Sequence, residues 1–139
     1  MMRKLDQRGI GAMEFCLVVL PLFMLMFAIF DLGRYAITMQ SVRALANAGA
    51  RATMIQCYTP AAIARTSPSG CTGSYMSNTD MQNAAPFLYG NGGGPPTLST
   101  AAGAAALTVT ASQPGFTMLT PLIWGTAFNA PSASTSVPF

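Results

Sequence analysis

Glu14 is the residue whose setting most demands a chemical explanation, because it interrupts an otherwise apolar run from Ile10 to Phe30. A carboxylate placed in hydrocarbon is costly and usually marks a functional position. Near a helix start it can instead reach the membrane interface, where the helix dipole favours negative charge. Alternatively, Glu14 pairs with a positive group on a neighbouring subunit, which lowers the cost of burying both charges. Its spacing favours this pairing, since Glu14 is the fifth residue after Gly9 and precedes Phe15.

The remaining residue types give little support to catalysis or metal binding. The chain has no histidine, which removes the commonest general base and metal ligand. Asp80 is the only acidic residue beyond Asp31, and no serine or cysteine has an identifiable base partner. The glycine-rich stretch at 90–96 lacks the lysine of a phosphate-binding loop. We therefore predict that the protein is not an enzyme and holds no cofactor and no metal.

Charge is scarce and unevenly placed along the 139 residues. Charged residues make up 8% of the chain, against about 25% in typical soluble domains. Most of the net charge of +3 arises before residue 10, where Arg3, Lys4 and Arg8 outnumber Asp6, and no cation follows Arg65. A nucleic-acid-binding protein needs a basic face, so we expect no nucleic acid among the partners.

The apolar run has the length of a membrane span. Its 21 residues, 10–30, match the roughly 20 needed to cross a bilayer core. The basic residues before it predict a cytoplasmic N-terminus, with the rest of the chain on the other side. No Ala-x-Ala site follows, which argues against a cleaved secretory signal, and Met13-Glu14-Phe15 before Cys16 does not fit a lipoprotein signal. Pro21 lies within the run, and a proline is tolerated in a membrane helix. The kink that it introduces has a functional role or has none.

Two motifs flank the span. The first is Arg8-Gly9-Ile10-Gly11-Ala12-Met13-Glu14-Phe15, and the second, after the run with Pro21, is Asp31-Leu32-Gly33-Arg34. Over residues 8–34 the sequence resembles the TadE-like pseudopilins of the Tad (tight adherence, Flp pilus) machinery of bacteria and archaea. The resemblance continues more weakly through the alanine-rich stretch at 44–52, and about the last 80 residues carry little of it.

The resemblance implies a processing step and a set of partners. In that family a prepilin peptidase cuts after the glycine, which puts the cut between Gly9 and Ile10 and makes 1–9 a leader. Glu14 and Phe15 would then be the fifth and sixth residues of the mature chain. Glu14 would contact the Ile10 amine of an adjacent subunit during assembly. The implied partners are the prepilin peptidase, other pilin or pseudopilin subunits, the Tad secretion apparatus and membrane lipid.

The length of the chain bears on its role. Major Flp pilins end soon after the span, whereas this chain adds more than 100 residues. The resemblance therefore favours a minor pseudopilin that takes part in Tad/Flp pilus assembly and adhesion. It implies a single-pass protein of the bacterial inner (cytoplasmic) membrane, with a periplasmic or extracellular C-terminal domain and association with the pilus. The alternatives are a single-span anchored envelope protein displaying a small binding domain, or a filament-forming pilin subunit.

We expect an α+β fold, in which a long N-terminal transmembrane and amphipathic helix precedes a small antiparallel β domain with short helices. The expected limits are a leader at 1–9, a transmembrane helix at 10–32, its amphipathic continuation at 33–57 and a small extracytoplasmic domain at 58–139. In the amphipathic part, apolar residues recur at helical spacing, namely Tyr35, Met39, Val42, Leu45 and Ala52. Packing of this stripe on the chain's own domain is favoured over a partner interface.

Two cysteines, Cys57 and Cys71, flank a polar loop in the extracytoplasmic part. Outside the cytoplasmic membrane the redox setting permits disulfides, so we predict a bond between them, with two free thiols as the alternative. A loop of about 15 residues closed in this way is worth around 3 kcal/mol in the chain-entropy model.

Two short helices are expected after the long one. Thr59-Pro60 has the pattern of an N-cap and first-turn proline for a helix at 61–65. Thr79 and Gln82 have capping-box spacing. The helix that they begin should end by about Ala85, because a proline follows.

Alternation of apolar and polar residues predicts strands at 107–112 and 133–137. Residues 113–115 form the expected turn, with 116–120 returning as the hairpin partner of the first strand. The expected core of this part is Phe116, Leu119, Leu122, Ile123, Trp124 and Phe128. Alternatively, the stretch at 121–128 is a binding patch.

Overall fold

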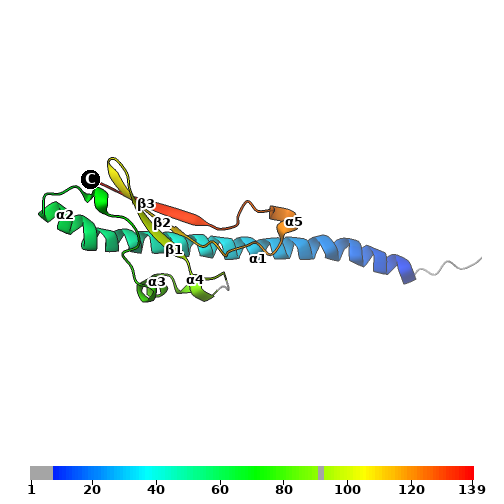
Figure 1. The fold of residues 1–139 in the computed structure, drawn as a ribbon. Helices are drawn as coiled ribbons and strands as arrows, with labels where there is room; N and C mark the ends of the chain where they lie inside the picture. The colour runs from blue at the N-terminus through cyan, green and yellow to red at the C-terminus, as the bar shows by residue number, and fades with distance from the viewer. Residues whose placement is uncertain (1–7, 91–92) are drawn as a thin grey trace, which may run out of the picture.

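A single long helix is the spine of the molecule (Figure 1). The computed structural model describes residues 8–90 and 93–139, so most of the predicted leader, residues 1–7, lies outside the described residues. Helix α1, Arg8–Thr53, passes through Pro21 and runs directly into the π-helical turn η1, Met54–Tyr58, and then α2, Thr59–Ile63. At 1.5 Å per residue this rod is on the order of 80 Å long.

The predicted helix start at Thr59 is wrong, because the chain is already helical there. Tyr58 and Thr59 both have right-handed helical dihedrals, and the Thr59 hydroxyl donates a hydrogen bond to the Met54 carbonyl at 2.8 Å. The π-helical turn ends two residues before Pro60, whose ring nitrogen has no N–H to donate to the helix. The rod ends after Ile63, and Arg65 adopts a left-handed conformation with φ of 56°.

Three antiparallel strands form one sheet in the order β1-β2-β3. They are β1, Thr97–Ala102, β2, Ala106–Ser112, and β3, Ser132–Pro138. The two strands predicted from alternation, β2 and β3, are confirmed. Residues 116–120 do not return as a hairpin partner, because both edges of β2 are already occupied by β1 and β3. The long connection between β2 and β3 is therefore left outside the sheet.

The core lies where the C-terminal half of α1 runs between the sheet and the α3–α4 pair (Figure 1). Helix α3 spans Asn78–Ala84 and α4 spans Pro86–Gly90. The cluster consists of Val42, Leu45, Ala46, Met81, Ala85, Leu88 and Ala111. The amphipathic stripe of α1 thus packs on the chain's own domain, and the α+β prediction is confirmed. Gly49 gives close packing here, because an added Cβ would meet the Leu98 side chain at 2.8 Å.

The N-cap of helix α3 lies two residues before the predicted one, Thr79. This N-cap is Ser77, whose hydroxyl accepts a hydrogen bond from the Asp80 N–H at 3.2 Å. The Asp80 carboxylate accepts one from the Ser77 N–H in return, at 3.4 Å. Both N-cap positions put Asp80 in the first turn, where the helix dipole favours a negative charge. Only Ser77 as N-cap places Asp80 at N3, from which its carboxylate reaches back to the N-cap N–H. The helix ends at Ala84, in agreement with the predicted limit.

The predicted disulfide is present. Cys57 in η1 and Cys71 are bonded with a Cα–Cα distance of 5.9 Å. Cys71 follows the short 3-10 turn η2, Pro68–Gly70, and is buried. The bond therefore ties the far end of the rod to the loop that leads back towards the sheet.

Candidate functional site

The N-terminal part of α1 is an uncovered apolar helix. The side chains of residues 11–30 are almost all exposed, including Leu17, Phe23 and Phe30. Exposed apolar surface of this extent is rare on a soluble monomer and marks an interaction surface. The helix is long and apolar enough to cross a membrane. It is the candidate membrane anchor of this protein.

Glu14 and Phe15 are exposed on this bare helix. Within the described part of the chain, Glu14 has no ion-pair partner. The Gly9–Ile10 peptide bond lies in the first turns of α1, which begins at Arg8, and Glu14 follows Ile10 by about one helical turn, roughly 6 Å of rise. Nothing in the described part of the protein competes for the Glu14 carboxylate, which leaves it available to a group from another molecule.

Asp31, at the end of the apolar run, has the opposite surroundings. Its side chain is 1% exposed, although a carboxylate is rarely buried without partners. It accepts hydrogen bonds from the Leu119 N–H at 3.1 Å, the Thr120 N–H at 2.9 Å and the Thr120 hydroxyl at 2.7 Å. Arg34, one turn further along α1, lies 3.7 Å away and supplies a positive charge. These contacts pin residues 119–120 to the exit of the apolar run.

The sequence patterns indicate no role for Asp31 beyond its place in the second motif. A charged residue at the end of an apolar run indicates where the uncovered part of a helix ends and its packed part begins. Its partners are 88 and 89 residues away along the chain, so no local pattern identifies them.

An aromatic cluster surrounds the Asp31 contacts. The Phe128 ring lies edge-on to Tyr35 at 5.1 Å and to Trp124 at 5.6 Å between ring centroids. The Arg34 guanidinium stands 5.4 Å from the centroid of the Phe116 ring, within the range of a cation–π interaction. Aromatic side chains and an arginine thus gather beside α1 just beyond its apolar run.

The predicted core of the C-terminal part is largely wrong. Of its six members only Phe116 is buried, while Leu119 is 71% exposed and Leu122 is 95% exposed. The cause is the position of α5, Pro121–Trp124, which is a single turn held beside α1 by Asp31 rather than placed under the sheet. Leu122 and Ile123 of α5 are therefore exposed, whereas Trp124 is half-buried against Phe128. The exposed pair fits the alternative interpretation of 121–128 as a binding patch.

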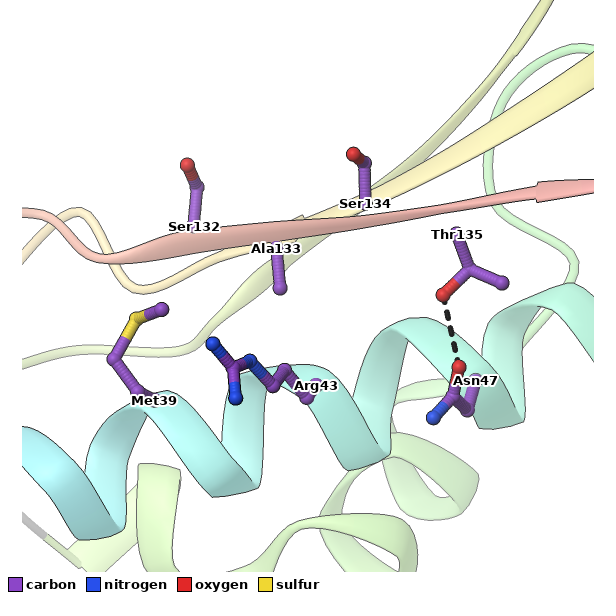
Figure 2. A pocket seen from close by; sticks show the side chains of 7 residues that line it. All are labelled: Met39, Arg43, Asn47, Ser132, Ala133, Ser134 and Thr135. Atoms are coloured by element: carbon purple, nitrogen blue, oxygen red, sulfur yellow. Dashed lines mark hydrogen bonds between the residues drawn. The ribbon is translucent and has the colours of Figure 1, made fainter.

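A polar groove lies between α1 and β3 (Figure 2). Its cavity volume is about 410 Å³, and its lining includes Met39 and Arg43 of α1 and Ala133 of β3. Figure 2 shows the Thr135 hydroxyl bonded to the Asn47 amide oxygen, at 2.8 Å, across the groove. Ser132 and Ser134 point away from the helix in the same view. The groove thus presents one cation and no nucleophile paired with a base.

Metal binding finds no site among the described residues. No group of three or more cysteine, aspartate or glutamate side chains gathers within residues 8–90 and 93–139. The remaining cysteine, Cys16, is exposed on the apolar part of α1 and is not disulfide-bonded.

Comparison with known proteins identifies one part of the chain. Residues 9–51 match the family model described as TadE-like protein. The matched segment comprises the bare apolar helix with Glu14 and Phe15, the Asp31 junction and the first part of the packed stripe. The resemblance inferred from the two motifs is thereby confirmed. Neither the curated proteins nor the solved structures contain a match to the chain.

Proposed function

Taking the TadE-like character of residues 9–51 as the premise, we propose that this protein is a minor pseudopilin of a Tad/Flp pilus. A prepilin peptidase removes the leader 1–9, and the mature chain begins at Ile10. Helix α1 anchors the chain in the inner membrane with its N-terminus in the cytoplasm, and the sheet domain lies outside. There the protein takes part in pilus assembly and adhesion together with other Tad subunits.

One observation carries this proposal: the TadE-like segment contains an uncovered helix of membrane length, in which Glu14 has no ion-pair partner among the described residues. An ordinary anchor needs no charge in its apolar run, since a charge there is costly. The spacing from Gly9 suggests an ion-pair partner for Glu14, because cleavage after Gly9 creates a new positive amine on every subunit. The amine of one subunit is then the partner of Glu14 on the next.

The domain around the C-terminal half of α1 supports a minor role. Its core cluster packs on one face of the helix from Val42 onwards, whereas the apolar side chains of residues 11–30 are almost all exposed. A subunit that carries such a domain suits the start or the tip of a filament. A filament-forming pilin subunit would instead be found at high copy number along purified pili.

The test is the N-terminus of the protein extracted from membranes of cells that carry a matching prepilin peptidase. Intact mass and N-terminal sequencing should give a chain that starts at Ile10. Gly9→Val should retain the leader, because the scissile bond must approach the peptidase closely. Gly33→Val is the matched control, since Gly33 is also helical and has no other atom within 4 Å of an added Cβ; it should be processed normally.

A wild-type chain that keeps residues 3–9 would overturn the proposal. The protein would then be a single-span anchored envelope protein that displays a small domain. Normal processing of Gly9→Val would likewise exclude Gly9 as the peptidase site.

A further inference from the structure

We propose that α5 and the preceding Leu119 form a second membrane contact, which inserts into the outer leaflet beside the span of α1. This proposal rests on the proposed function in one respect, namely that the apolar part of α1 lies in a bilayer. The occupant of the surface is lipid acyl chain and headgroup. The contact would fix the height and the rotation of the domain above the membrane.

The first argument is continuity with the span. Met24 and Phe27 of α1 line a single cavity of about 230 Å³ together with Leu122 and Ile123 of α5. Figure 1 shows α5 lying alongside α1, away from the sheet. Phe27 and Met24 precede Asp31 by four and seven residues, about 6 and 10 Å of helix rise. A bilayer that covers these two side chains therefore reaches α5 as well.

The second argument is the character of the α5 surface. Leu122 is 95% exposed and Leu119 is 71% exposed, and both belong to a segment with no charged side chain from position 81 to the end of the chain. Peripheral helices bury their apolar face about 5–10 Å into the headgroup and acyl boundary. The depth set by Phe27 and Met24 agrees with this range.

The third argument is the aromatic cluster, which includes Trp124 of α5 itself. Tyr35, Trp124 and Phe128 form the aromatic cluster, and Arg34 lies next to it. Tyrosine and tryptophan are enriched at membrane–water interfaces, where arginine side chains reach the headgroups. The Asp31 hydrogen bonds hold α5 at this level, so the contact is built into the fold.

The experiment uses the only tryptophan of the chain, Trp124, as the reporter. The full-length protein is reconstituted into phosphatidylcholine and phosphatidylglycerol vesicles that contain lipids brominated at a shallow or a deep acyl position. Trp124 fluorescence should be quenched at least twofold more by the shallow bromines than by the deep ones. Aqueous iodide should quench it only weakly.

The double variant Leu122→Asn/Ile123→Asn should lose about half of the shallow-lipid quenching and gain iodide quenching. Leu122 is 95% and Ile123 is 44% exposed, and neither belongs to the core cluster, so the change leaves the core of the domain intact. The matched control is Ile63→Asn, which replaces a side chain that is 79% exposed at the far end of the rod. This control should leave the quenching of Trp124 unchanged.

A second reporter separates this proposal from the anchoring that it assumes. The double variant Phe23→Trp/Trp124→Phe moves the single indole into the span itself. Quenching of this variant by deep bromines, without lipid quenching of Trp124 in the wild type, would leave the anchor intact and overturn the α5 contact. Absence of lipid quenching in both proteins would overturn both. Shielding of Trp124 that arises only when other pilin subunits are added would overturn the lipid contact and assign the patch to a subunit instead.

Discussion

Two carboxylates of the same helix illustrate what a charge near a membrane requires. Asp31 is buried and receives three hydrogen bonds and a nearby guanidinium from its own chain. Glu14 is exposed among apolar side chains and has no ion-pair partner within the described residues. Both need compensation in a membrane setting. For Asp31 the fold supplies it, and for Glu14 we infer that an adjacent subunit does.

Glu14→Ala should therefore separate insertion from assembly. The variant removes a charge from the span, so extraction with detergent and resistance to carbonate washing should match the wild type. Breaking a buried ion pair by removing one partner costs about 3–5 kcal/mol, and pili counted by electron microscopy should be strongly reduced. Glu14→Asp keeps the charge and should retain part of the piliation. Wild-type pilus numbers in Glu14→Ala would contradict the pairing.

Asp31→Asn should loosen the α5 segment without affecting the span. The amide keeps the shape of the side chain but loses the charge and one acceptor, and hydrogen bonds to charged groups are worth about 1.5–3 kcal/mol each. Hydrogen exchange at the Leu119 and Thr120 amides should quicken in detergent micelles. Thr120→Val removes only the hydroxyl bond at 2.7 Å and should have a smaller effect. Unchanged exchange in Asp31→Asn would show that these bonds do not hold the segment.

At the scale of elements, the loop after β2 and the loop before β1 approach each other closely at two glycines. Gly115 follows β2 and Gly93 precedes β1, and a Cβ on Gly115 would overlap the Gly93 carbonyl group. Nearby, the Gln113 amide donates hydrogen bonds to the carbonyl groups of Leu88, at 3.2 Å, and Gly94, at 2.8 Å. The turn after β2 is therefore packed against the start of β1 and α4, which explains why the following residues leave the sheet.

Gly115→Ala should consequently destabilise the domain, because two backbone segments would have to separate. Overpacking of this kind costs about 1–3 kcal/mol, which denaturant unfolding followed by circular dichroism would detect. Gly90→Ala is the control, since an added Cβ at Gly90 has no other atom within 4 Å. Equal stability of the two variants would mean that the loops move apart freely.

At the scale of the whole molecule, the domain is fastened to the rod at two distant points. Asp31 attaches the connection between β2 and β3 to α1 at the end of the apolar run. The disulfide of Cys57 and Cys71 fastens the opposite end, and Gly73 then pairs with Thr100 of β1 through two backbone hydrogen bonds of 3.0 and 2.7 Å. A force applied to the sheet domain would thus reach the rod at two points, one in the middle of α1 and one beyond its C-terminal end.

Removal of the Cys57–Cys71 disulfide should lower the stability of the domain measurably. Cys57→Ser/Cys71→Ser should lower the free energy of unfolding by around 3 kcal/mol, as expected for a closed loop of about 15 residues. In the wild type, these two thiols should resist alkylation until the protein is reduced. Cys16→Ser is the control, because Cys16 is not disulfide-bonded, and its stability should be unchanged. Ready alkylation of Cys57 in unreduced protein would contradict the bond.

Features that depend on short-range patterns are predictable from the amino-acid sequence. The length and composition of the apolar run predict the bare helix, and alternation predicts β2 and β3. The spacing of Gly9, Glu14 and Phe15 carries the family resemblance, which extends over residues 9–51. The cysteine pair was predicted from its setting alone. Each of these signals lies within a few helical turns or one strand, where side-chain periodicity reports burial directly.

Which surfaces are covered depends on tertiary contacts that the sequence patterns do not reveal. It placed β1 and β3 on the two edges of β2 and so excluded residues 116–120 from the sheet. It also joined Asp31 to Thr120, which turned the predicted core residue Leu122 outwards beside the span. The physical reason is distance along the chain: an apolar residue is buried or exposed according to partners that lie 88 or 89 positions away, and local periodicity carries no information about them.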